Sequence, residues 1–183
     1  MFRQDLRLHL NQDERLKMEN KTRSDLVFKL YYSYNLENLF YHCNVRLNNL
    51  FTVIQLLLSS AIIGDLSRYT AINVNIIIGI VLAVLSALSL VYRFGEKSVS
   101  ARIGADRYSA LIHRYPKMSD DELAEALLES HPLDNYITGA FADIAYKRAA
   151  IQLGLEDETH LSCYQSFIAK FCGEKFNDRA SSL

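Results

Sequence analysis

Charged residues are absent from two closely spaced stretches of the chain, Leu47 to Gly64 and Tyr69 to Tyr92, although they make up 22% of the whole. As helices rising about 1.5 Å per residue, the 18 residues of the first stretch reach roughly 27 Å and the 24 of the second roughly 36 Å. The apolar core of a bilayer is about 30 Å thick, so both helices can cross it. The sequence therefore predicts an integral membrane protein built around a hairpin of two transmembrane helices.

The two stretches differ in how strongly they predict a membrane span. The second is longer, and its segment Ile76 to Leu85 is apolar throughout apart from Gly79. The first is close to the minimum length and contains polar side chains at Asn48, Asn49, Gln55, Ser59 and Ser60. A buried helix of a soluble domain is therefore the alternative interpretation of the first stretch.

The flanking charges predict the orientation of the hairpin. Only Asp65 to Arg68 separate the two stretches, which is enough for a turn and too short for a folded domain. Basic residues gather on the other side of the hairpin, at Lys29, Arg46, Arg93, Lys97, Arg102 and Arg107, against Arg68 alone in the turn. Because the cytoplasmic flanks of membrane helices are enriched in Lys and Arg, both termini are expected in the cytoplasm. The polar first 46 residues predict no cleavable signal peptide.

The rest of the sequence predicts helices, so the expected fold is an all-α membrane protein. It divides into a cytoplasmic N-terminal helical segment (1–46), the transmembrane hairpin (47–93) and a cytoplasmic helical extension and tail (94–183). Apolar residues recur at helical spacing from Leu36 to Leu50, which predicts one continuous helix from the cytoplasm into the first span. Residues 5–24 are rich in charge of both signs and predict an exposed helix.

A second long helix is expected to leave the membrane and run to about Tyr115, because Pro116 is the first strong helix breaker after the second span. Ser119 and Glu122 then have the spacing of a capping box, which predicts a short helix ending at Ser130.

The C-terminal part is expected to complete a small helical bundle around that projecting helix. Pro132 suits the first turn of a helix that Gly154 can end. An amphipathic stretch from Thr159 to Phe171 predicts a last helix, whose apolar face would cover the one before it.

The sequence predicts no catalytic residue, no metal site and no cofactor. A zinc site at His160, Cys163 and Cys172 would lack a fourth ligand, and ordinary helix-face positions are the simpler interpretation. The chain has no phosphate-binding glycine loop and no nucleophile elbow, so an enzyme is not expected. Its net charge of -1 provides no basic field that would favour direct nucleic-acid binding.

Polar residues inside the hairpin follow one face of each predicted span. The candidate pore-lining residues are Asn48, Thr52, Gln55 and Ser59 in the first span and Asn75, Ser86 and Ser89 in the second. Beside the second stripe, Gly79, Ala83 and Ala87 form a small surface that lets helices approach closely. The polar stripes have two interpretations, which the spacing leaves open: hydrogen bonding between helices, or the wetted lining of a pore.

The layout over residues 25–170 resembles the SLATT superfamily, two-transmembrane effector domains found with nucleotide-signalling and other bacterial anti-phage systems. The likeness rests on the tight turn Asp65 to Arg68 and on a long emerging helix through Asp106-Arg107-Tyr108-Ser109-Ala110-Leu111. The tail string His131-Pro132-Leu133-Asp134-Asn135-Tyr136 is similar to the branch associated with reverse transcriptases, including retrons.

The resemblance implies an effector of the bacterial inner membrane that forms a pore or disrupts the membrane when a partner sensor triggers it. The implied partners are membrane lipid, further copies of the chain, and a sensor, either a reverse transcriptase or retron nucleoprotein or a nucleotide-signalling protein. Two helices cannot enclose an aqueous path, so conduction would require a homo-oligomer. The alternatives are a passive membrane tether that holds a cytoplasmic partner, and a phage holin, which would leave the large tail without a role.

Overall fold

The computed structural model describes residues 22–63, 74–135, 137, 139–156 and 159–176, and their regular structure is helical throughout. The main helices are α2 (Arg23–Ile63), α3 (Val74–Tyr92), α4 (Phe94–Arg114), α5 (Asp120–Ser130), α6 (Ala142–Leu153) and α7 (Cys163–Cys172). Short 3-10 helices occur at η2 (Tyr115–Lys117), η3 (His131–Leu133) and η4 (Gly139–Phe141). The turn Asp65–Arg68 and nearly all of the helix expected over 5–24 lie outside the described residues.

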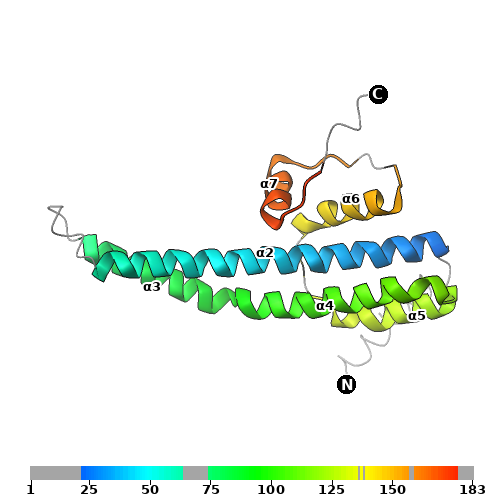
Figure 1. Cartoon of the computed structure of the whole chain (residues 1–183), viewed down its shortest axis with the longest axis horizontal. Helices are drawn as coiled ribbons and strands as arrows, with labels where there is room; N and C mark the ends of the chain where they lie inside the picture. Colours follow the sequence, from blue (N-terminus) through cyan, green and yellow to red (C-terminus); the bar gives the residue numbers. More distant parts are fainter. Residues whose placement is uncertain (1–21, 64–73, 136, 138, 157–158, 177–183) are drawn as a thin grey trace, which may run out of the picture.

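Helix α2 is the axis of the molecule. Its 41 residues form one unbroken helix of roughly 62 Å, which confirms the continuous helix predicted from Leu36 into the first uncharged stretch. Figure 1 shows α3 and then α4 returning beside α2, with α5 beyond α4 and with α6 and α7 on the opposite side of α2. The C-terminal part of α2 and most of α3 extend past the remaining helices as a stalk of two helices.

The long helix expected after the second span is broken at Arg93, which corrects the prediction at this point. Arg93 has φ 49° and ψ 46°, the left-handed conformation, so α3 ends at Tyr92 and α4 begins at Phe94. The break brings the ring of Phe94 into a stack with Tyr92, at 5.6 Å between centroids, and against Phe51 of α2 at 5.3 Å. The far end of the expected helix is confirmed, because α4 ends at Arg114.

Two apolar cores lie on opposite sides of α2. The first joins Leu26 and Leu30 of α2 to α4 and α5 through Tyr108 and Leu127. The second joins α2 to α6 and α7, at Leu39, Phe141, Ile144, Ala145, Ile168, Ala169 and Cys172. A single helix therefore contributes to both cores, so neither can rearrange without affecting α2.

The predicted helix ends in the tail are partly confirmed. Helix α5 has the capping box, in which Ser119 and Glu122 each accept a hydrogen bond from the other's backbone amide. Gly154 ends α6 in the left-handed conformation, as predicted. The α-helix expected to start at Pro132 begins only at Ala142: Pro132 lies in η3, and Asp134 and Asn135 after it lie outside a helix and make hydrogen bonds to α4 and α2.

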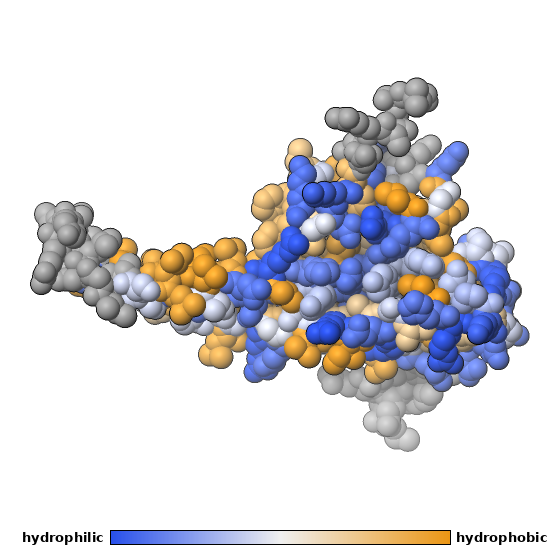
Figure 2. Space-filling view, in the orientation of Figure 1, coloured by the Kyte–Doolittle hydropathy of each residue, from blue (hydrophilic) through white to orange (hydrophobic). Residues whose placement is uncertain are grey.

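The stalk exposes apolar surface that a soluble protein would bury. Within the described residues, the segment Asn75–Lys117 contains a stretch long and apolar enough to cross a membrane, and only 6% of that stretch is buried. Leu56, Leu57 and Ile80 are each at least 60% exposed. Figure 2 shows orange surface over the stalk and mainly blue surface over the helical body. One apolar helix of this length indicates association with a membrane.

Candidate functional site

The predicted polar residues of α2 occupy two kinds of position. Asn48 is half-buried and faces α4, where a β-carbon added at Gly95 would lie 3.6 Å from its side-chain oxygen. Thr52 and Ser59 are exposed, and the Thr52 hydroxyl donates to the carbonyl oxygen of Asn48 at 2.9 Å. Part of the predicted stripe therefore lies between the helices of one chain, and part lies on its surface.

Gln55 links the two helices of the stalk. Its side-chain nitrogen donates to the hydroxyl of Ser86 on α3 at 3.4 Å. Both side chains, together with Ser89, line an open recess of about 450 Å³ at the base of the stalk. The recess continues past the break between α3 and α4 to Arg93 and Glu96, which form an ion pair at 3.1 Å. Polar groups from both predicted stripes thus share one open recess at the base of the stalk.

The remaining candidates on α3 follow from which of its faces contacts α2. Ile78 is buried at 8% exposure, and Asn75 and Ser89 are half-buried, so this face is the one turned to α2. Ala83 and Ala87 are exposed, and a β-carbon added at Gly79 would meet nothing within 4 Å. The predicted small surface is therefore open in the single chain.

A buried carboxylate is the strongest polar feature of the helical body, and the sequence analysis missed it. Glu37 of α2 is only 2% exposed, and its carboxylate accepts hydrogen bonds from the backbone and side-chain nitrogens of Asn135, both at 2.8 Å. It also lies against Gly104 of α4, where an added β-carbon would approach its carboxyl carbon to 2.8 Å. Burial raises the pKa of Glu37 above its ordinary value, and the Asn135 hydrogen bonds oppose that rise.

A second carboxylate extends this network. The Tyr108 hydroxyl lies 2.7 Å and 2.8 Å from the two carboxylate oxygens of Asp134, to which it donates, and Arg107 lies 3.6 Å from one of them. Burial raises the pKa of Asp134, against the opposing effect of Tyr108, and burial together with Asp134 raises the pKa of Tyr108. A recess of about 320 Å³ opens onto Glu37 and Asp134, so the network has a route to solvent.

The network brings together two strings that the sequence analysis quoted for the family resemblance. Arg107 and Tyr108 come from the emerging-helix string, and Asp134 and Asn135 from the tail string. The sequence did carry a signal for Glu37, because it falls on the helical spacing of Leu26 and Leu30, where an apolar residue is expected. A charged residue at such a position indicates a buried polar contact.

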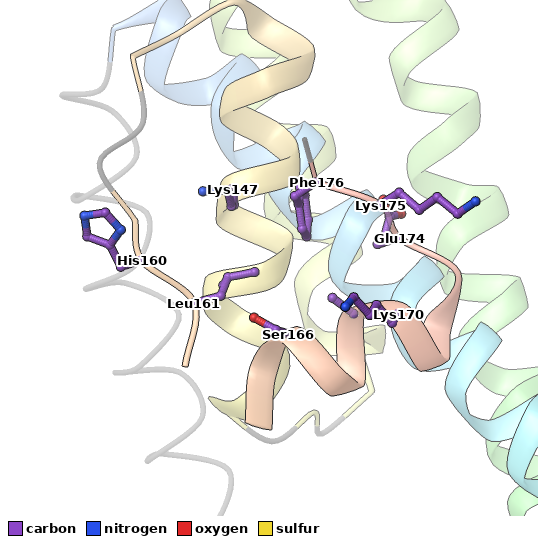
Figure 3. Close-up of a pocket in the computed structure, with 9 residues that line it drawn as sticks. Lys147, His160, Leu161, Ser166, Lys170, Glu174, Lys175 and Phe176 are labelled. Carbon is purple, nitrogen blue, oxygen red and sulfur yellow. The ribbon is translucent and has the colours of Figure 1, made fainter. Parts of the chain in front are cut away.

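The cavity drawn in Figure 3 lies between α6 and α7 and measures about 510 Å³. Leu161 and Phe176 point into it, whereas His160 and Lys175 point away. The amine of Lys147 donates to the carbonyl oxygen of Thr159 at 2.9 Å. Because the basic groups do not converge, the cavity offers no focused site for an anion.

The residues considered for zinc are separated in the structure. Cys172 is buried in the core between α7 and α2, beside Cys43, whereas Cys163 is exposed at the start of α7. Within the described part of the chain, no group of three or more His, Cys, Asp or Glu side chains could hold a metal ion.

Comparison with known proteins gives no relative, because no protein-family model, curated protein or solved structure matches the chain.

Proposed function

We propose that this protein is a membrane effector of a bacterial anti-phage defence system, which oligomerises in the inner membrane and makes it permeable when a partner sensor releases or activates it. The stalk is a transmembrane hairpin in this proposal, with both termini in the cytoplasm. The protein acts without a catalytic site, and the damage to the cell follows from ion flow. The sensor is a reverse-transcriptase or retron nucleoprotein, or a nucleotide-signalling protein, as the family resemblance implies.

One observation carries the proposal: Gln55, Ser86 and Ser89 line a single open recess at the base of a stalk whose exposed surface is largely apolar. Polar side chains on a helix in lipid are costly unless they meet another helix or water. Copies of the hairpin that turn this recess toward a common axis would place polar groups around an aqueous path. The apolar side chains Leu56, Leu57 and Ile80 would then face lipid.

The body supports transmission of a trigger to the stalk. Glu37 lies in α2 and binds the segment after α5, so that a change in the tail acts on the same helix that contains Gln55. The two residues are 18 positions apart in one helix, or roughly 27 Å. A sensor bound to the tail therefore has a direct mechanical connection to the proposed pore.

A passive membrane tether remains the second candidate, and the hydrogen bond between Gln55 and Ser86 favours it. In a tether the polar stripes only hold helices together, and the tail positions a cytoplasmic partner. The two candidates differ in whether triggering changes the membrane potential.

The test replaces Asn75, Ser86 and Ser89 together by leucine and measures membrane potential and oligomer size on the same cells. If these residues line a pore, ion flux and toxicity are lost while insertion and oligomer size stay normal. Leucines at Ile77, Val81 and Val84 are the matched control, because those side chains are apolar and exposed on the same helix. The control variant should depolarise cells as the unmodified protein does.

Two outcomes would count against the pore. An intact triple-leucine oligomer that still depolarises cells removes this face from the conduction path. If the triple variant loses its oligomer, or the unmodified protein never depolarises cells under its native trigger, the tether explains the stripes better.

A further inference from the structure

Helix α7 has an aromatic flank that no other part of the described chain covers. Tyr164 and Phe167 are 66% and 67% exposed, and the ring of Phe167 stacks on that of Phe171 at 6.4 Å between centroids. A neighbouring side of α7 lines the cavity toward α6 through Ser166 and Lys170. The buried face, at Ile168, Ala169 and Cys172, packs in the core that α7 shares with α2, η4 and α6. The aromatic flank is therefore turned away from α6.

The position of α7 along α2 places this flank at the base of the stalk. The core contacts of α7 on α2 are with Leu39 and Cys43. The guanidinium of Arg46 donates to the carbonyl oxygen of Phe171, near the end of α7. Arg46 is the last charged residue before the uncharged stretch that begins at Leu47. In Figure 1, α7 lies beside α2 at the edge of the body that is nearer to the stalk, whereas α6 lies beside the more distant part of α2.

Other aromatic and basic side chains lie at nearly the same level. Phe51 contacts Phe94 five residues after Arg46, roughly 7.5 Å further along α2. The amine of Lys97 lies 5.6 Å from the centre of the Tyr92 ring. Lys170 is exposed on α7 itself. Aromatic rings prefer the headgroup layer of a bilayer, and Lys and Arg beside them attract anionic lipid headgroups.

We propose that α7 is an interfacial helix, which rests its aromatic flank of Tyr164, Phe167 and Phe171 on the cytoplasmic leaflet of the membrane that the stalk crosses. This inference rests on the proposed membrane insertion of the stalk. The flank lies at the level of Arg46, where the uncharged stretch of α2 begins, and basic side chains lie near it, which is why lipid, rather than a protein partner, is the occupant. The body then has two attachments to the membrane, one through the stalk and one through α7.

The absence of tryptophan from the chain allows a direct test, because each introduced tryptophan is the sole one. Full-length Phe167→Trp is reconstituted in vesicles of phosphatidylcholine and phosphatidylglycerol that contain lipids with a nitroxide quencher close to the headgroup. Interfacial helices insert about 5–10 Å at the headgroup boundary, so the Phe167→Trp emission should fall by roughly half. Phe167 is mostly exposed, so the larger ring requires no repacking of the core.

Two further tryptophan variants distinguish a failure of the interfacial helix from a failure of the membrane insertion of the stalk. Tyr146→Trp is the control within the body, because Tyr146 packs on Phe28, 18 residues or roughly 27 Å before Arg46, and its emission should be unaffected. Leu56→Trp reports insertion of the stalk through a nitroxide deep in the acyl chains. If Leu56→Trp is quenched but Phe167→Trp is quenched no more than Tyr146→Trp, the interfacial helix is overturned. The membrane insertion of the stalk is then retained. Unquenched Leu56→Trp would overturn the membrane stalk and the interfacial helix together.

Discussion

Glu37 shows how one buried residue can join three segments of the helical body. Its carboxylate lies in α2, receives both of its described hydrogen bonds from Asn135, and closes the space above Gly104 of α4. A buried carboxylate is costly unless its oxygens are hydrogen-bonded, and the Asn135 amide and backbone supply those bonds. The segment after α5 is held against α2 for this reason.

The raised pKa of Glu37 predicts a pH dependence of stability. The native state holds the proton more tightly than the unfolded chain, so this contribution to stability is fully present below the unfolded carboxyl pKa. It is lost as pH rises through the higher folded pKa. The free energy of unfolding of the full chain in detergent, followed by its helical circular dichroism, should therefore decrease over that interval.

Glu37→Gln removes the titrating group and should flatten this dependence. Some decrease of the unfolding free energy with rising pH should remain, because burial also raises the pKa of Asp134. Arg107 favours the ionised form of both Glu37 and Asp134, and Lys29 favours that of Asp134. These charges reduce the change of unfolding free energy with pH. An unchanged pH profile in Glu37→Gln would show that this carboxyl does not titrate in the range that its burial implies.

Among the elements, the close contact of α2 with α4 depends on Gly104, a residue without a side chain. Gly104→Ala would bring a β-carbon within 2.8 Å of the Glu37 carboxyl carbon. Overpacking of this kind costs about 1–3 kcal/mol, against about 1 kcal/mol gained from the better helix propensity of alanine. The expected net result is a loss of unfolding free energy of up to about 2 kcal/mol, measured by denaturant titration.

Gly95→Ala is the matched control for that prediction, because it lies in the same helix and its added β-carbon would make an ordinary contact at 3.6 Å. This variant should be neutral or slightly stabilising. Equal effects of the two substitutions would mean that the contact between Glu37 and Gly104 does not limit the packing of α2 on α4.

Local signals predicted the element ends well where the residues act within their own helix. The capping box at Ser119 and the left-handed Gly154 needed no knowledge of distant residues, and both predictions are confirmed. The late start of α6 and the break at Arg93 instead coincide with contacts to residues far away in sequence, Glu37 and Phe51. Periodicity alone does not contain such contacts.

The residues of the candidate site likewise include some that local spacing predicts and others that only the fold brings together. The spacing of Gln55, Ser86 and Ser89 placed these polar residues on helix faces, and the structure adds that they share one recess. The network of Glu37, Tyr108 and Asp134 joins three separate segments, so no local pattern could have assembled it. Whether the polar faces line a pore stays a prediction.

For the whole molecule, the open small surface of α3 predicts assembly between copies. Gly79→Leu should reduce the oligomer to smaller species, because a bulky side chain holds apart helices that the surface of Gly79, Ala83 and Ala87 lets approach. A β-carbon at Gly79 meets nothing within the chain, so the fold of each copy should be unaffected. Mass photometry in mild detergent measures the oligomer size.

Val81→Leu serves as the control, since Val81 is exposed on another side of the same helix. It should leave the oligomer unchanged. A Gly79→Leu protein with the oligomer size of the unmodified chain would exclude this surface from the contact between copies, and a monomeric unmodified protein would argue against assembly altogether.

The two helical paths that form the stalk and its continuation differ in stiffness. Helix α2 is continuous, whereas α3 and α4 are separate helices that meet at Arg93. Helix α2 continues from the body to the end of the stalk, whereas its neighbour changes direction at Arg93. A rotation of α2 about its own axis at Glu37 turns Gln55 through nearly the same angle, because a continuous helix resists twisting along its length. The break at Arg93 lets α3 follow that rotation without dragging α4 out of the body. This pair of helices therefore transmits a rotation of α2 about its axis better than a sliding movement along that axis.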